Sequence, residues 1–195
     1  MRSVWIVLAL LLVPAMVGAQ SVERYPAGAP VPVPRSPSEG GTLPVPHRSI
    51  GSVSVGERAP DFELESASGG HRHLSDWRGS WVALWFGSRA PSIAVADSLA
   101  HAVAADGVAV LMVAAERTGM LRGWLDKHPD AMATLLSDSM HDIACEYGAF
   151  DATRGQSTPG FVLIDADGVV RVAVMGVALG SEDARRMVQI AKTAL

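Results

Sequence analysis

WVALWFGSRAPSI, residues 81–93, passes from six apolar residues directly into a turn and the start of a helix. A run that is apolar at every position is typical of a central strand covered on both faces, whereas a strand with one solvent-exposed face alternates apolar and polar residues. Pro91 suits the first turn of a helix, because the N–H that proline lacks would be unpaired there. An alanine-rich helix is expected to follow as far as about Ala105, and Gly107 to end it. The stretch predicts a buried strand leading into a helix that covers a sheet.

From Val55 onward, short apolar runs alternate with stretches of helical period, which predicts an α/β domain with a mixed sheet covered by helices. Gly69-Gly70 and the turn DADG at 165–168 indicate two hairpins. Thr118 and Ser139 are the expected caps of two helices. The predicted strands cover residues 61–66, 71–76, 81–86, 108–115, 133–137, 161–165 and 169–174, and the predicted helices cover 91–105, 118–128, 139–147 and 181–195.

The first nineteen residues have the pattern of a secretory signal peptide. A positive charge at Arg2 precedes an apolar run from Val4 to Val13, and small residues precede Gln20. We expect cleavage after Ala19, with an uncleaved membrane anchor as the alternative. Because the run is shorter than the roughly 20 residues that a bilayer requires, the sequence predicts a secreted or periplasmic protein with no membrane segment after cleavage.

Residues 20–54 are expected to form a disordered linker. Seven of the 12 prolines lie between residues 20 and 56, among Gly, Ser and Val and without an apolar period. A ligand for a proline-recognising domain is the alternative. Residues 55–195 then form a single domain.

The overall charge of the chain excludes one class of partner. The formal net charge is −4, the isoelectric point is about 5.8, and lysines and arginines do not cluster along the chain. Proteins that bind nucleic acid carry a basic patch or stripe, so we expect no nucleic-acid partner. The oligomeric state is left open.

Several pieces of the sequence occur in the order in which the redoxin group of thioredoxin-fold proteins carries them. They are APDF (59–62), LSDWRG (74–79), the apolar strand before the turn, LLSD (135–138) ahead of YG (147–148), and TPGFVLIDADGVV (158–170). Through them most of residues 55–195 resembles the peroxiredoxins of the alkyl hydroperoxide reductase and thiol-specific antioxidant (AhpC/TSA) group and the extracytoplasmic thiol-disulfide oxidoreductases. The resemblance implies a thioredoxin-like α/β fold, with a central mixed β-sheet flanked by helices and an N-terminal β-hairpin extension.

The resemblance also implies antioxidant or thiol-disulfide oxidoreductase activity, but the chain departs from the family at the reactive turn. Family members have a Cys-x-x-Cys motif there, and the amino terminus of the helix lowers the pKa of the first thiol. Here Ala90 and Ile93 stand at those positions, and the threonine and cysteine of the peroxiredoxin pattern fall on the same two residues. We therefore predict a redox-degenerate turn without a catalytic residue.

The remaining residues of the turn favour binding. The Ser92 hydroxyl has no visible base to activate it, and hydroxyls at helix starts are commonly caps. Arg89 suits an anion or the carboxylate of a partner, or else is a solvated surface residue. Thr158-Pro159 matches the family's cis-proline position beside a peptide-binding groove; an ordinary trans loop proline is the alternative. We predict a protein or peptide partner bound by Arg89, Pro91, Ser92, Thr158 and Pro159.

Cys145 is the only cysteine of the chain. On a helix over 139–147 it points away from the apolar stripe, so we expect it to be partly exposed, with His141 one turn before it. A neighbouring imidazolium would lower the pKa of the thiol, which makes a weak one-cysteine peroxidase or redox sensor the alternative function. The competing interpretation is a small apolar residue that fills space in the core.

His71 and His73 face the same side of a predicted strand. Two ligands are short of a metal site, and the sequence indicates no third. We expect no metal and no cofactor.

Overall fold

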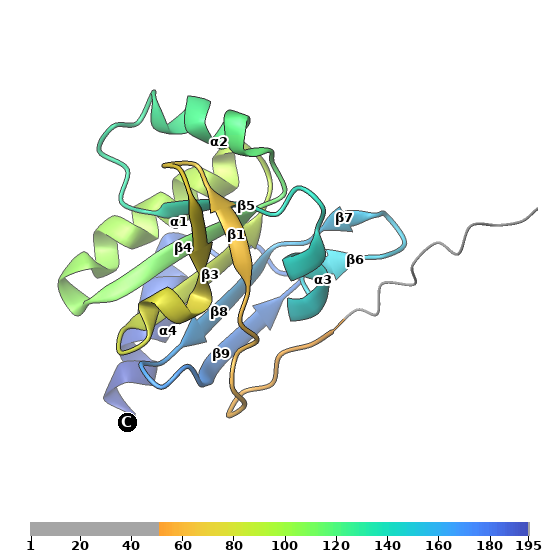
Figure 1. Ribbon diagram of the computed structural model, residues 1–195. Coiled ribbons are helices and arrows are strands. Elements are labelled where there is room, and N and C mark those ends of the chain that lie inside the picture. Colours follow the sequence, from red (N-terminus) through yellow and green to blue (C-terminus); the bar gives the residue numbers. More distant parts are fainter. Residues whose placement is uncertain (1–50, 195) are drawn as a thin grey trace, which may run out of the picture. The chain divides into compact units, whose positions relative to one another are not determined.

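The computed structural model describes residues 51–194 of the chain (Figure 1). The chain divides into two units, Met1–Val45 and Pro46–Leu195, and the described residues belong to the second. The predicted signal peptide, and the predicted linker up to residue 50, lie outside the described residues. Between residues 51 and 194, no helix is long and apolar enough to cross a membrane.

The elements of the domain follow the predicted order with two differences: the predicted strand 71–76 ends at His73 and continues as a 3-10 helix, and two short strands at 150–151 and 156–157 were not predicted. The strands are β1 Glu63–Ser66, β2 His71–His73, β3 Trp81–Gly87, β4 Val108–Ala114, β5 Thr134–Ser137, β6 Phe150–Asp151, β7 Gln156–Ser157, β8 Gly160–Ile164 and β9 Val170–Met175. The helices are α1 Arg89–Val103, α2 Thr118–Leu125, α3 Asp142–Tyr147 and α4 Ser181–Thr193, with 3-10 helices at Leu74–Trp77 and Ala104–Asp106.

Seven of the strands form one sheet, in the order β2-β1-β5-β4-β3-β8-β9, while β6 pairs with β7 separately. The central strand β3 is parallel to β4 and antiparallel to β8, so the sheet is mixed. At one edge, β1 and β2 form an antiparallel hairpin. The predicted mixed sheet with an N-terminal hairpin is thereby confirmed.

Different helices cover the two faces of this sheet (Figure 1). On one face α1 packs against β4 and α4, and Trp85 shares a core with Ile93 and Phe161. On the other face Phe86 shares a core with Tyr147 of α3. Because successive residues of a strand point to opposite faces, a strand covered on both must be apolar throughout, which explains the run at 81–86.

The structure corrects the prediction around residues 138–157. The predicted helix 139–147 begins only at Asp142, because the buried carboxylate of Asp138 binds the helix start and accepts the N–H of Ala144 at 2.8 Å. Ser139 is therefore not the cap. The hairpin of β6 and β7 is absent from the sequence prediction, because strands of two residues show no alternation.

Gly87 ends β3 at a point of close approach. A Cβ atom placed there would lie 2.8 Å from the Oγ and 2.9 Å from the Cβ of Ser92, which is in the first turn of α1. Carbon atoms in contact prefer separations of about 3.5–4.0 Å. Glycine at this position lets the helix begin directly against the end of the strand.

Asp165 holds together the turn between β8 and β9. Its buried carboxylate accepts the N–H groups of Asp167 and Val169, both at 2.9 Å, and the Nε–H of Arg171 at 2.6 Å. It also forms an ion pair with the Nη2 of Arg171 at 2.5 Å. Burial pushes the pKa of Asp165 upward, but the hydrogen bonds and the positive charge of Arg171 outweigh it, so that the pKa is lowered. The turn is thus anchored by an ionised carboxylate.

Replacement of Gly87 by Ala is expected to reduce the free energy of unfolding by about 1–3 kcal/mol, because the added methyl group overpacks the start of α1. Gly119→Ala is the matched control, since a Cβ at Gly119 in α2 meets nothing within 4 Å. The control is expected to be neutral or to gain up to about 1 kcal/mol from helix propensity. Urea unfolding of the two variants measures the difference, and equal midpoints would contradict the close packing described above.

Asp165→Asn is expected to cost about 2–3 kcal/mol near neutral pH, because it removes the charge that Arg171 and the turn N–H groups bind. A carboxyl with a lowered pKa in the folded state stabilises fully above its ordinary pKa of 3.8 and loses this contribution as the pH falls through the folded value. The stability difference between wild type and variant should therefore shrink below about pH 4. Denaturant titrations at a series of pH values test this, and a difference that grows in acid would refute it.

Candidate functional site

The site lies where β3 passes into α1. Arg89, the first residue of α1, has a φ of 69°, a left-handed conformation that is uncommon for a residue with a side chain. Its backbone N–H donates to the Oε1 atom of Glu116, which follows β4. Gly87 and Ala114 are paired at the ends of the two parallel strands, so both loops leave the sheet at the same edge. The register of β3 and β4 thus brings Glu116 to the turn.

The two positions of the family motif differ in their surroundings. Ala90 is exposed, whereas Ile93 is 3% exposed and belongs to the core beside Trp85. At these positions the turn presents a methyl group to solvent and an aliphatic side chain to the core. Neither can form a thiolate, a disulfide or a sulfenic acid.

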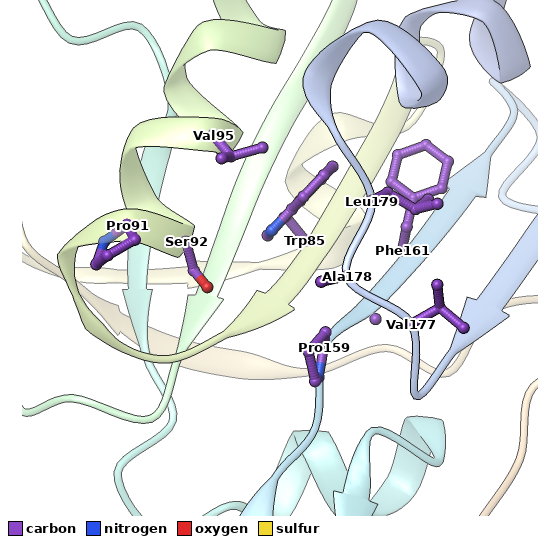
Figure 2. A pocket seen from close by; sticks show the side chains of 10 residues that line it. Trp85, Pro91, Ser92, Val95, Pro159, Phe161, Val177, Ala178 and Leu179 are labelled. Atoms are coloured by element: carbon purple, nitrogen blue, oxygen red, sulfur yellow. The ribbon is translucent and has the colours of Figure 1, made fainter.

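One side of the turn opens into a cavity that we call the Pro159 pocket, with a volume of about 190 Å³. Figure 2 shows side chains of α1 on one side of this pocket, Pro159 at its mouth and the segment after β9 opposite α1. Two aromatic rings at its base, those of Trp85 and Phe161, meet edge to face with centroids 5.8 Å apart. The lining residues are Trp85, Pro91, Ser92, Val95, Pro159, Gly160, Phe161, Val177, Ala178 and Leu179.

The Pro159 pocket contains three of the five residues predicted to bind a partner. Pro91, Ser92 and Pro159 line it together, whereas Thr158 and Arg89 do not. The backbone N–H of Thr158 donates to the carbonyl oxygen of Ala149 at 2.9 Å. The prediction of a cis bond before Pro159 was wrong: none of the peptide bonds in residues 51–194 is cis. The family pattern placed the proline beside the turn correctly but not its isomer.

The other side of the turn has a cavity of about 220 Å³, which we call the Glu116 pocket. Sequence reasoning missed Glu116. A signal was available, because a charged residue directly after a buried strand parallel to β3 must lie at the edge where α1 begins. The lining residues of this pocket are Arg89, Ala90, Ile93, Glu116, Met120, Leu121 and Trp124.

Cys145 lies away from both pockets. It is only 4% exposed, so the prediction of partial exposure was wrong. The prediction assumed a helix with one buried face, but the segment at Gly51 also lies against α3, where its N–H donates to the Cys145 carbonyl at 2.9 Å. His141 precedes the helix, with a φ of 60°, and its Nδ1 lies 2.8 Å from the Oγ of Ser157. The imidazole of His141 is thus engaged by a hydroxyl.

The paired histidines of the hairpin lie on an exposed surface. His71 has its Nδ1 3.3 Å from the Oε1 of Glu63 on the neighbouring strand, and both side chains are more than half exposed. Within the described part of the chain, no three His, Cys, Asp or Glu side chains gather in a way that could hold a metal ion.

Comparison with known proteins identifies the family and the fold of this chain. Residues 55–173 match the model of the AhpC/TSA family. Over 156 residues the chain is 30% identical to the selenocysteine-containing peroxiredoxin PrxU of Peptoclostridium acidaminophilum, a match that covers 70% of this chain and 76% of that protein. The fold is similar to that of the reduced 2-Cys peroxiredoxin of Plasmodium vivax, at 23% identity and a TM-score of 0.60 over 72% of this chain and 97% of that one. It is also similar to AhpC of Enterococcus faecalis, at 13% identity and a TM-score of 0.65 over 73% and 94% of the two chains. The chain therefore belongs to the AhpC/TSA family and has the thioredoxin-like fold of the peroxiredoxins.

Proposed function

We propose that this member of the family is an extracytoplasmic protein that has lost thiol redox chemistry and holds a protein or peptide partner in the Pro159 pocket. The observation that carries the proposal is the composition of the turn. Ala90 and Ile93 stand where the Cys-x-x-Cys motif has its thiols, and Ile93 also stands where the peroxiredoxin pattern has its cysteine. The only cysteine of the chain is buried outside both pockets. The relative from Peptoclostridium is named for a selenocysteine, and this turn carries neither sulfur nor selenium.

The Pro159 pocket lacks the groups that other kinds of catalysis need. No side chain that titrates near neutral pH lines it, so the Ser92 hydroxyl has no base beside it. A serine without an adjacent base is a poor nucleophile. Binding is the activity that such a lining supports.

The shape and chemistry of the pocket favour an apolar side chain of an extended segment. Its walls are apolar and aromatic, and Val177 at its rim is 54% exposed. Exposed apolar surface around a concave site is typical of protein and ligand contacts. The signal-peptide pattern of residues 1–19 supports an encounter with this partner outside the cytoplasm.

The alternative function, a one-cysteine peroxidase or redox sensor at Cys145, receives less support. Reactive cysteines are partly exposed, and this one is nearly fully buried. The nearby His141 points a ring nitrogen at Ser157. A buried thiol without access for an oxidant fits the role of an apolar core residue.

The purified mature chain, beginning at Gln20, is expected to show no insulin reduction and no peroxide consumption above buffer. The physical reason is the absence of an accessible thiolate, which both reactions require. The control is Cys145→Ser, which should leave the baseline unchanged. Activity that is present in the wild type and disappears in Cys145→Ser would establish the one-cysteine function instead.

Partner binding is tested with a photo-crosslinking amino acid at Val177, on the rim of the Pro159 pocket. We expect a discrete adduct with a protein of the periplasmic fraction, and none from the same group placed at Ile190, which is 70% exposed on α4. Ala178→Trp fills the pocket and should reduce the adduct at least about tenfold, equivalent to about 1.4 kcal/mol. The control is Ala152→Trp, at an exposed position outside the pocket. No adduct, or an adduct that Ala178→Trp leaves unchanged, would rule out this binding site.

A further inference from the structure

We propose that Glu116 occupies the anion position at the amino terminus of α1. Its negative charge then disfavours a thiolate in this turn, in addition to the absence of a cysteine. The inference rests on the proposed loss of thiol chemistry from the turn. It assigns to Glu116 the role of a positioning residue that sets the charge of the site.

The first observation is the bond that Glu116 makes. The amino terminus of a helix stabilises negative charge through its unpaired backbone N–H groups, and this effect activates a cysteine at that place. In this chain the N–H of Arg89, the first of α1, already donates to the Oε1 of Glu116. Pro91 in the same turn has no N–H to contribute. A carboxylate from another loop thus takes up one of the N–H donors at the start of α1.

The second observation is the burial of the remaining carboxylate oxygen. The Oε2 atom of Glu116 is inaccessible to solvent and has no hydrogen-bond partner among the described residues. Ala90 lines the same pocket, and the other walls are mainly the apolar side chains of Ile93, Leu121 and Trp124. Charges interact more strongly in apolar surroundings than in water. An anion at position 90 would therefore lie at the same pocket as a carboxylate that has one oxygen shielded from water.

The other charged groups around the pocket do not cancel the negative charge of Glu116. Arg89 is the only cationic side chain in the lining, and it is exposed, so water and salt screen its charge. His128 stacks on the outer part of the pocket wall, with its ring centroid 3.9 Å from that of Trp124. The Pro159 pocket on the other side of the turn has no ionisable side chain that is charged at neutral pH. Glu116 is thus the only negatively charged side chain in the lining of this pocket.

Glu116 also supports the backbone of the turn. The experiment must therefore distinguish this structural role from the effect of the negative charge. The left-handed φ of Arg89 is unfavourable for a residue with a side chain, and the bond to Glu116 compensates for it. Glutamine keeps an acceptor oxygen for this bond while removing the charge. A thiol pKa at position 90 reports the charge and is insensitive to a purely structural contribution.

The experiment uses the full mature chain in a Cys145→Ser background, with Ala90→Cys as the probe. The pH profile of alkylation by iodoacetamide gives the pKa of the new thiol, with and without Glu116→Gln. We expect Ala90→Cys alone to have a pKa at or above the ordinary value of about 8.5, despite its place at a helix start. Addition of Glu116→Gln should lower this pKa by at least about one unit.

The matched control is Glu57→Gln, which changes the net charge equally. Glu57 is exposed, and its loop pairs with Val170 near the turn after Ile164, at the opposite end of β3 from Gly87. This control should shift the thiol pKa by no more than a few tenths of a unit, because distant exposed charges are screened.

Two results would overturn the proposal. One is a thiol pKa in Ala90→Cys that lies well below the ordinary value while Glu116 is present. The other is a shift on Glu116→Gln no larger than that on Glu57→Gln. If circular dichroism shows that Glu116→Gln does not fold, the thiol pKa of Ala90→Cys alone still supports or overturns the proposal. Because every variant carries an engineered thiol, the results do not depend on partner binding or on wild-type activity.

Discussion

The burial of β3 on both faces is the constraint on which the rest of the domain depends. The strand lies between parallel β4 and antiparallel β8, with α1 and α4 over one face and α3 over the other. No polar side chain is tolerated along it, because a buried polar group without a partner is costly. The strand is regular as far as Gly87, and the turn at Gly87 therefore lies at a fixed point at the edge of the sheet. The absence of a side chain at Gly87 leaves room there for Ser92 in the first turn of α1.

This arrangement brings the loops that follow two parallel strands together at the start of α1. The same helix turn separates the apolar Pro159 pocket from the Glu116 pocket, and the two parallel strands bring a carboxylate to its first N–H group. In a family whose fold is built around a thiol, this chain has a methyl group at Ala90 and a negative charge next to it. The missing sulfur and the neighbouring carboxylate both fit the proposal that this turn takes part in binding through apolar contacts without thiolate chemistry.

The agreement between sequence and structure varies with the length of the element. Long apolar or amphipathic segments such as 81–86 and the helix after Ser181 were predictable, because each buries a continuous face. The short α3 was misjudged because Asp138, and not Ser139, binds its first turn. The exposure of Cys145 was misjudged because the pattern of a single helix carries no information about a second segment packed against it.

The sequence alone determined the order of the longer strands and helices, the family resemblance and the absence of sulfur from positions 90 and 93, since each of these depends on local pattern or residue identity. Only the tertiary structure decided that Pro159, Pro91 and Ser92 share one pocket, that the bond before Pro159 is trans and that Cys145 is inaccessible. It also decided that Glu116 meets the first N–H of α1. These facts depend on contacts between segments far apart in the chain, and the register of a parallel strand pair leaves no periodic signal in either strand.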